Sequence, residues 1–390
     1  MAKPKGPAVA KRTVAKRTVA AQALGWIEAT TRAVVPPIHP SASYERANDG
    51  SYPGGHSYSR DQNPTYDQAE ALLAELEGGA EALLFASGMA AATTLFETLE
   101  PGAHVVAPAQ MYWTIRLWLQ DLAARGRIAL DFVPNGDVDA LRAALRPGET
   151  RLVWLETPSN PLCAITDLAA SAEVAHTAGA RVVADATLAT PVFTQPLALG
   201  VDVVMHSATK QLNGHADVLA GALVTRECDE PWQRVRFERG YRGAVLGPFE
   251  AWLLLRGMRT LFLRVEASAR GAQRVAEFLA ERDEVAGVFY PGLPGHPGHA
   301  IASRQMHGGF GPLLSFRVHG GEPGARRVGG TLQLFKQASS LGGLESLVEH
   351  RASVEGPGTT VPEDLLRLSI GIEDPEDLLQ DLANALQSPR

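Results

Sequence analysis

The sequence predicts an α/β protein with a mostly parallel sheet in a large domain, followed by a smaller C-terminal α/β domain. Strand-like and helix-like segments alternate from about Asp67 to Leu223, as they do in consecutive βαβ units. The segment Phe249 to Leu263 is apolar, rich in leucine and helical in pattern, and we expect it to link the two domains. Gly308 to Gly311 and Gly320-Gly321 then separate short strand-like segments of the second domain. The predicted division is an N-terminal arm over 1–62, a large domain over 63–255 and a small domain over 256–390.

The composition is that of a globular protein with a sizeable core. The chain has 390 residues, of which 45% are hydrophobic and 20% are charged, enough for two packed domains. Its net charge of -7 gives no sign of nucleic-acid binding, and no run approaches the roughly eighteen apolar residues of a membrane span. The two cysteines, Cys163 and Cys228, have no spacing typical of a metal site or a disulfide framework. We therefore expect a cytoplasmic protein with no metal, nucleic-acid or membrane partner.

The first twenty residues form a distinct basic segment without an acidic residue. The repeat Ala10 to Val14 is followed by a second copy, Ala15 to Val19. The segment lacks the apolar core of a secretory signal. We predict a mobile basic tail, with a targeting or anion-binding role as the alternative.

Lys210 is the first candidate for chemistry. It follows Val201 to His206, an apolar segment that predicts a buried strand, and it stands beside the hydroxyls of Ser207 and Thr209. A lysine at this place suits a Schiff base to an aldehyde cofactor whose phosphate the hydroxyls bind. The alternative is a surface lysine that opens a loop.

Asp185 supplies the carboxylate that such a cofactor needs. It ends the apolar strand Ala180 to Ala184, and ligands in open α/β sheets bind beyond the carboxyl ends of the strands. Pyridoxal phosphate acts as an electron sink while a buried carboxylate keeps its ring nitrogen protonated. A helix-capping aspartate is the alternative interpretation.

Two further strand ends carry polar loops. Ser87-Gly88-Met89 lies between the apolar run Ala82 to Phe85 and the helix-like run Ala90 to Phe96, which places it at a helix N-terminus that suits a phosphate. Glu156 to Pro161 contains two prolines, and its rigid loop would hold the Asn160 amide against the phenolic oxygen of the ring. A turn without a ligand would explain either segment as well.

Together these pieces resemble the Cys/Met-metabolism family of pyridoxal-phosphate enzymes, which contains cystathionine γ-synthase, cystathionine β- and γ-lyases, methionine γ-lyase and the homoserine sulfhydrylases. The resemblance runs from about Val35 to Leu386. It implies a fold type I transferase fold, similar to that of aspartate aminotransferase. Its landmarks, in family order, are Tyr58-Ser59-Arg60, Asn63-Pro64-Thr65, Ser87-Gly88-Met89, Tyr112, Glu156 to Pro161, Asp185, Ser207 to Lys210, Gly214-His215, Leu253 to Gly257, Ser340 to Gly343, Glu345 to Leu347, Arg367 to Gly371 and Glu373-Asp374.

The resemblance implies a role for each cofactor-site residue. Lys210 would carry the internal aldimine, Asp185 would pair with the pyridine nitrogen and Tyr112 would stack on the ring. Tyr58 and Arg60 would reach the phosphate of a neighbouring subunit, which implies at least a dimer, and we expect a homotetramer. The phosphate would be held by Ser87, Gly88, Met89, Ser207 and Thr209.

The substrate side follows from the same resemblance. Arg367 would take the α-carboxylate of an amino acid, with Ser340 and Asn160 nearby, since a guanidinium fork matches a carboxylate in geometry and charge. The freed Lys210 amine would act as a base toward the α-proton. Tyr112 and Tyr58 are candidates to help set the protonation of the amine and of the leaving group, with aromatic packing as the alternative.

Several positions depart from the usual family patterns and leave the substrate open. Ser339 stands where the γ-acting enzymes usually have glutamate, Trp113 where they have glycine, and Ala216 where a serine is usual. The stretch between His350 and Leu365 is also short. We expect a cystathionine γ-synthase-like activity, with cystathionine β-lyase or another carbon–sulfur lyase as the alternative, and a non-catalytic binding protein as the alternative of a different class. The G-x-G-x-x-G and G-x-x-x-x-G-K turns of dehydrogenases and nucleotide hydrolases do not occur.

Overall fold

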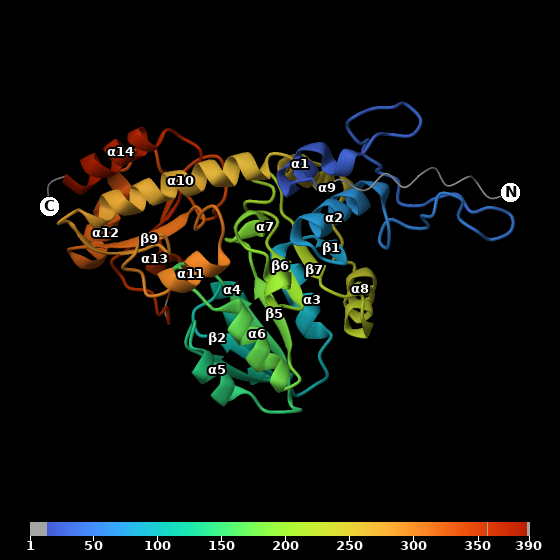
Figure 1. Cartoon of the computed structure of the whole chain (residues 1–390), viewed down its shortest axis with the longest axis horizontal. Helices are drawn as coiled ribbons and strands as arrows, with labels where there is room; N and C mark the ends of the chain where they lie inside the picture. Colours follow the sequence, from blue (N-terminus) through green and yellow to red (C-terminus); the bar gives the residue numbers. More distant parts are fainter. Residues whose placement is uncertain (1–13, 357, 388–390) are drawn as a thin grey trace.

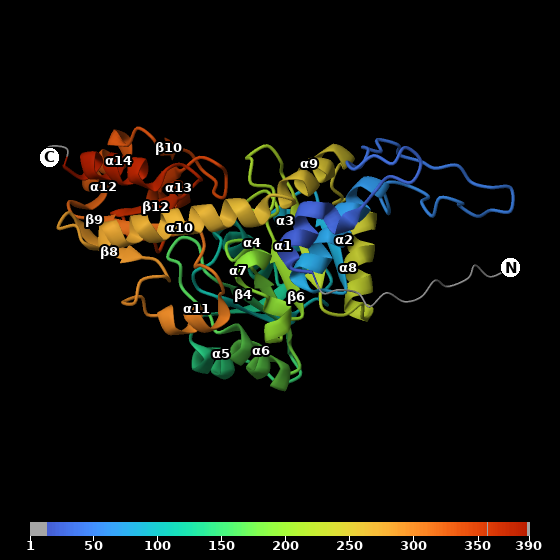
Figure 2. The same cartoon turned by 45° about the horizontal axis from the view of Figure 1, so that its top comes forward.

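Two β-sheets lie next to one another, and one long helix extends from the first to cover the second (Figure 1). The structure is a computed structural model that describes residues 14–356 and 358–387. The long helix, α10 (Leu261–Ala280), contacts elements of the larger half near its start and two strands of the smaller sheet further along. The same arrangement is visible from a second direction in Figure 2.

The larger sheet has seven strands and is mostly parallel, as the sequence predicts. Counted from one edge, the first five strands all run parallel to one another. Only one strand, next to the other edge, runs antiparallel to both of its neighbours. That strand is β7. In spatial order the strands are β1 (Glu81–Phe85), β7 (Gly221–Thr225), β6 (Val203–His206), β5 (Arg181–Asp185), β4 (Thr150–Glu156), β2 (Ala103–Pro108) and β3 (Ile128–Val133).

Helices cover both faces of this sheet. In β1, Ala82 and Leu84 pack into one apolar cluster while Leu83 and Phe85 pack into another on the opposite face. Strands buried on both faces are the rule when helices form the crossovers between parallel strands. The helices are α2 (Pro64–Glu77), α3 (Gly88–Glu97), α4 (Trp113–Ala124), α5 (Val138–Ala144), α6 (Leu168–Thr177), α7 (Thr190–Phe193) and α8 (Glu230–Arg242), with a 3₁₀ turn, η2 (Pro196–Leu199).

The smaller sheet has five strands and is mostly antiparallel. Its order is β10 (Lys336–Gln337), β11 (Leu347–His350), β12 (Leu365–Ser369), β9 (Leu313–Val318) and β8 (Val285–Phe289), and only β10 and β11 pair in parallel. Side chains of α10, α12 (Gly321–Thr331) and α14 (Pro375–Gln387) build an apolar core against it. Two shorter helices, α11 (His299–Gln305) and α13 (Arg351–Glu355), complete this half.

The predicted linking helix is interrupted. The expected segment Phe249 to Leu263 contains all but the first residue of one helix, α9 (Pro248–Met258), and the start of α10. The reason is a buried arginine, because the Arg264 guanidinium donates to the carbonyl of Gly257 at 2.7 Å and to that of Gln211 at 2.9 Å. These bonds satisfy a carbonyl at the end of α9 and tie the junction to the loop that follows Lys210. The predicted boundary between residues 255 and 256 falls inside α9, and the domain division stays a prediction.

Part of the basic N-terminal segment belongs to the fold. Residues 1–13 lie outside the described residues, so the prediction is untested there. The second repeat copy instead enters the fold as α1 (Lys16–Gln22), followed by a 3₁₀ turn, η1 (Ala23–Gly25). Lys16 Nζ donates to the carbonyl of Leu76 at 2.7 Å, Arg17 pairs with Glu266, and Ala20 is buried. A mobile tail is therefore wrong for this copy, because α1 packs against α2 and α10.

None of the described helices combines the length and the apolar character that a membrane crossing requires.

Candidate active site

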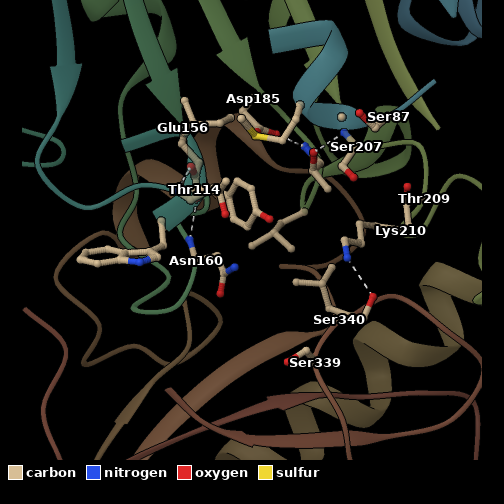
Figure 3. Close-up of a pocket in the computed structure, with 18 of the residues that line it drawn as sticks. Ser87, Thr114, Glu156, Asn160, Asp185, Ser207, Thr209, Lys210, Ser339 and Ser340 are labelled. Atoms are coloured by element: carbon tan, nitrogen blue, oxygen red, sulfur yellow. Dashed lines mark hydrogen bonds between the residues drawn. The ribbon is translucent and has the colours of Figure 1, made fainter. Parts of the chain in front are cut away.

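One pocket gathers most of the residues that the sequence singles out. A cavity of about 470 Å³ lies beyond the carboxyl ends of β4, β5 and β6, where loops of the smaller sheet close over it. This volume is ordinary for a site that binds a small molecule. The predicted residues that line it are Ser87, Gly88, Met89, Tyr112, Asn160, Asp185, Ser207, Thr209, Lys210, Ser340 and Arg367, several of which are labelled in Figure 3.

Lys210 lies in the turn after β6 and points toward the smaller sheet. Its Nζ donates to Ser340 Oγ at 2.8 Å (Figure 3). Burial and the nearby Arg367 guanidinium lower the pKa of Lys210 from 10.5 to about 8. Around pH 8 a large share of this amine is therefore neutral, as a nucleophile toward an aldehyde must be.

Ser340 is held in an unusual backbone conformation. Its φ of 121° is positive, which is strained for a residue with a side chain. The Arg367 guanidinium donates to its carbonyl at 2.8 Å while its hydroxyl accepts from Lys210. The strained turn thus presents a carbonyl to one cationic side chain and a hydroxyl to the other.

Asp185 is a buried carboxylate at the end of β5. Its Oδ1 accepts the N–H of Thr187 at 3.0 Å, and no lysine or arginine in the described part of the chain forms an ion pair with it. Burial raises the pKa of Asp185 above its ordinary value. A cationic N–H donor in the pocket would satisfy this group, and a protonated pyridine ring is such a donor.

Glu156 organises two of the predicted residues, a role that we did not expect. It lies opposite Asp185 in the sheet register, and its carboxyl oxygens accept the N–H of Tyr112 at 2.7 Å and of Asn160 at 2.8 Å. Burial and the neighbouring Asp185 raise the pKa of Glu156. The side chain therefore fixes the loops that carry Tyr112 and Asn160. In the sequence it is the first residue of the landmark Glu156 to Pro161, directly after an apolar run, but nothing there marked it as the residue that fixes these loops.

The N-terminus of α3 forms a cradle for an anion. Ser87 caps the helix by accepting the N–H of Ala90 at 3.0 Å, and a helix leaves its first N–H groups without partners inside the helix. A Cβ atom on Gly88 would lie 3.0 Å from Ser207 Cβ, so glycine permits this close approach. The donors and the space suit a phosphate.

Thr209 lines the same pocket, but its hydroxyl is engaged elsewhere. It donates to the carbonyl of Ala220 at 3.1 Å and accepts the N–H of that residue at 2.9 Å. The hydroxyl proton that a phosphate would need is therefore already used in this structure. At Ser207 it is the backbone N–H that is engaged, because it donates to Thr187 Oγ1 at 2.8 Å.

Arg367 lies in contact with both Asn160 and Ser340. Arg367 lies on β12, is 3% exposed, and donates to Asn160 Oδ1 at 3.2 Å. It also pairs with Glu349 at 2.7 Å. Burial lowers the pKa of Arg367 to about 10, so it stays charged at neutral pH. A fixed, desolvated guanidinium of this kind is suited to a carboxylate.

Two more charged residues of the pocket were not predicted from the sequence. Glu349 on β11 and Arg351 at the start of α13 line the cavity beside Ser339, whose hydroxyl donates to Glu349 Oε1 at 2.6 Å. Burial raises the pKa of Glu349, but Arg367, Ser339 and Arg351 outweigh it and lower the pKa overall. No motif marked these residues, because charged side chains in Glu349-His350-Arg351 are equally typical of a surface turn.

Tyr58 and Arg60 lie outside this pocket. Both are exposed, and they line a separate hollow with the Arg60 guanidinium 5.4 Å from the centre of the Tyr58 ring. Of the three departures from the family pattern, Trp113 and Ser339 line the pocket, whereas Ala216 is exposed and does not.

Comparisons with known proteins agree with this geometry. The family model described as "Cys/Met metabolism PLP-dependent enzyme" matches residues 17–387. Cystathionine γ-synthase of Mycobacterium bovis is 46% identical over 363 residues, 91% of this chain and 92% of that protein. Cystathionine γ-lyase of Bacillus subtilis is 40% identical over 367 residues, 92% of this chain and 95% of that protein.

A solved structure is similar over nearly the whole chain. Cystathionine γ-synthase from Xanthomonas oryzae pv. oryzae, in complex with cystathionine, superposes with a TM-score of 0.92 and 39% identity, covering 96% of this chain and 98% of that one. The pocket supplies a partly neutral lysine, a buried carboxylate and a helix N-terminus, which fit pyridoxal phosphate. The chain belongs to the family of pyridoxal-phosphate-dependent enzymes of cysteine and methionine metabolism.

Proposed function

We propose that this enzyme is cystathionine γ-synthase-like and joins an O-acylhomoserine to cysteine, giving cystathionine and the free acid. The observation that carries the proposal is the contact between the Lys210 amine and Ser340, beside the Arg367 guanidinium. It sets a candidate base next to a candidate carboxylate-binding residue. The γ-synthases among the relatives support the choice of reaction.

The residues of this chain would divide the work as follows. Pyridoxal phosphate, when bound, supplies the electron sink that makes protons next to the α-amino group acidic. Arg367 and Asn160 would hold the substrate's α-carboxylate, and the Lys210 amine would take the α-proton and return it. Ser340 would aim that amine. In the balanced reaction the Cγ–O bond breaks and the carboxylate leaves, the cysteine sulfur bonds to Cγ, and the thiol proton is released.

For the cofactor, Asp185 would pair with the ring nitrogen and Tyr112 would stack on the ring. The phosphate would lie at the start of α3, against Ser87, Gly88, Met89 and Ser207, and Thr209 would donate to it once its hydroxyl turned away from the Ala220 carbonyl. The cations that line the pocket, within the described ranges, are Lys210, Arg351 and Arg367, which leaves the cradle with neutral donors.

The lack of a cationic side chain at the phosphate cradle, among the residues that the structure describes, supports an assembly in which a neighbouring subunit supplies one. Arg60 and Tyr58 are exposed, and they would reach the phosphate of a neighbouring subunit. We infer at least a dimer, and a homotetramer as the complete assembly. A cytoplasmic location stays a prediction.

A carbon–sulfur lyase is the second candidate, because one relative with similar coverage is a cystathionine γ-lyase. The test is to incubate the cofactor-loaded enzyme with O-succinyl- or O-acetylhomoserine plus cysteine, and separately with L-cystathionine, and to identify the products by mass. Cystathionine from an ester supports the synthase. Pyruvate and homocysteine from cystathionine would mean β-elimination, 2-oxobutyrate and cysteine would mean γ-elimination, and no product from any mixture would overturn both candidates.

A further inference from the structure

Two buried arginines, not one, line the pocket. Arg351 is 6% exposed and Arg367 is 3% exposed. They come from neighbouring elements of the smaller half, and Glu349 lies between them, directly opposite Arg367 in the register of β11 and β12. Both guanidinium groups contact the same oxygen, Glu349 Oε2, at 2.7 Å.

This carboxylate is fully engaged. Its other oxygen, Glu349 Oε1, accepts the Ser339 hydroxyl at 2.6 Å. Arg351 has one more partner, Glu355, at 2.8 Å. The serine thus helps to hold Glu349 in place between the two guanidinium groups.

Each guanidinium still has an unused donor. The Nε–H groups of Arg351 and Arg367 are buried and have no hydrogen-bond partner among the described residues. A buried donor without a partner is unfavourable, and a side-chain adjustment that brings it to an acceptor of a ligand in the pocket removes this cost. An amino acid with one carboxylate can satisfy Arg367 in the proposed function, and the Arg351 donor would remain.

We propose that Arg351 binds a second carboxylate of the reacting molecules. The inference rests on the proposed function, in which Arg367 takes the α-carboxylate. Two sources carry the required chemistry: the acyl group of a dicarboxylic ester such as O-succinylhomoserine, or the carboxylate of the cysteine that becomes the distal half of cystathionine. Arg351 is then a specificity-determining residue, and Ser339 and Glu349 position it.

The kinetic test compares substrates with and without the second carboxylate in wild type and Arg351→Gln. If the acyl group is the source, the variant loses about 10- to 100-fold in kcat/KM for O-succinylhomoserine and little for O-acetylhomoserine. If cysteine is the source, the variant loses a similar factor for cysteine and little for cysteamine, which has no carboxylate. Arg351→Lys keeps the charge without the planar fork, so its kcat/KM for the affected substrate should lie between those of wild type and Arg351→Gln. An equal loss for all substrates, or none, overturns the proposal.

A binding measurement makes the result independent of turnover. The holoenzyme is titrated calorimetrically with three dicarboxylates of increasing length, succinate, glutarate and adipate. Butyrate, which has one carboxylate, is the comparison ligand. Arg351→Gln should weaken the best dicarboxylate by about 10-fold or more beyond any change in its affinity for butyrate, which it can alter only through the shared Glu349. Equal affinity of wild type and variant for every dicarboxylate contradicts the proposal even if the enzyme proves to be a lyase.

Arg317→Gln is the matched control. Arg317 also pairs with a carboxylate of the smaller half, Asp364, at 2.8 Å, but it does not line the pocket. It should not change the ratios between substrates. An unchanged visible spectrum and thermal midpoint for Arg351→Gln show that the variant is folded and loaded.

Discussion

Lys210 is a largely desolvated amine near a second cation, Arg367, and this has a consequence for stability. The folded protein lowers its pKa from 10.5 to about 8. Below pH 8 both the folded and the unfolded chain carry the charge, so the folded state bears the full cost of burial. Between pH 8 and 10.5 the unfolded chain binds more protons, so the free energy of unfolding rises with pH.

We therefore expect Lys210→Met to raise the free energy of unfolding of the cofactor-free protein by ~2 kcal/mol at pH 7. The gain should shrink steadily as the pH rises toward 10.5. Guanidinium chloride unfolding at pH 7 and pH 10 measures both values, with Lys336→Met, an exposed lysine, as the control for loss of charge. A gain that is the same at both pH values would show that burial of the charge is not its cause.

Substitutions of Lys210 and Asp185 should also have different effects on the bound cofactor. Lys210→Ala should lose the visible absorbance of the covalently held cofactor and about 100- to 10,000-fold in activity, since the base is removed. Asp185→Asn should keep the covalent bond but lose activity, because an amide does not stabilise a protonated ring. Absorption spectra recorded beside the assay make the distinction, and an unchanged spectrum in Lys210→Ala would refute the assignment.

At the scale of elements, the phosphate cradle depends on how closely α3 approaches the turn after β6. Gly88→Ala would place a Cβ atom 3.0 Å from Ser207 Cβ and Oγ, tighter than ordinary contact. We expect cofactor affinity to fall by about 10-fold, corresponding to roughly 1 to 2 kcal/mol of overpacking. Fluorescence titration of the cofactor-free protein measures this. Gly287→Ala, where an added Cβ meets nothing within 4 Å, should bind the cofactor as wild type does.

The elements also show what a sequence can and cannot predict. Asp185, Lys210 and the start of α3 were predictable because each follows an apolar run, and strand ends of a parallel sheet meet at one edge. Arg351 was not predictable, since its burial depends on the register of β11 against β12 and on the fold of α13. The interruption between α9 and α10 was missed for a similar reason. The apolar pattern continues across it, and the hydrogen bonds that Arg264 on α10 donates to Gly257 and Gln211 depend on the folded structure.

At the scale of the whole molecule, the shared-site proposal predicts complementation. Arg60→Ala should weaken the phosphate site of a neighbour, and Lys210→Ala should disable its own pocket. Each variant alone should be nearly inactive. Coexpression should restore part of the activity, because a mixed dimer contains one site in which both residues are intact.

The measurement is the specific activity of copurified, differently tagged subunits, with each variant expressed alone as the control. Mixed dimers as inactive as the two parents would mean that Arg60 does not act across the interface. Size-exclusion chromatography with light scattering then gives the assembly, for which we expect four subunits.

The contact between Lys210 and Ser340 joins the two halves of the molecule across the pocket. The amine lies in the turn after β6 of the seven-stranded sheet, whereas the serine lies in the loop between β10 and β11 and Arg367 lies on β12 of the five-stranded sheet. Under the proposed function, Lys210 would give up this contact while it holds the cofactor, and a bound substrate held by Arg367 would connect the two halves in addition to the freed amine. The substrate would then act as a reversible crosslink: its binding would hold the two halves together, and its release would let them move apart.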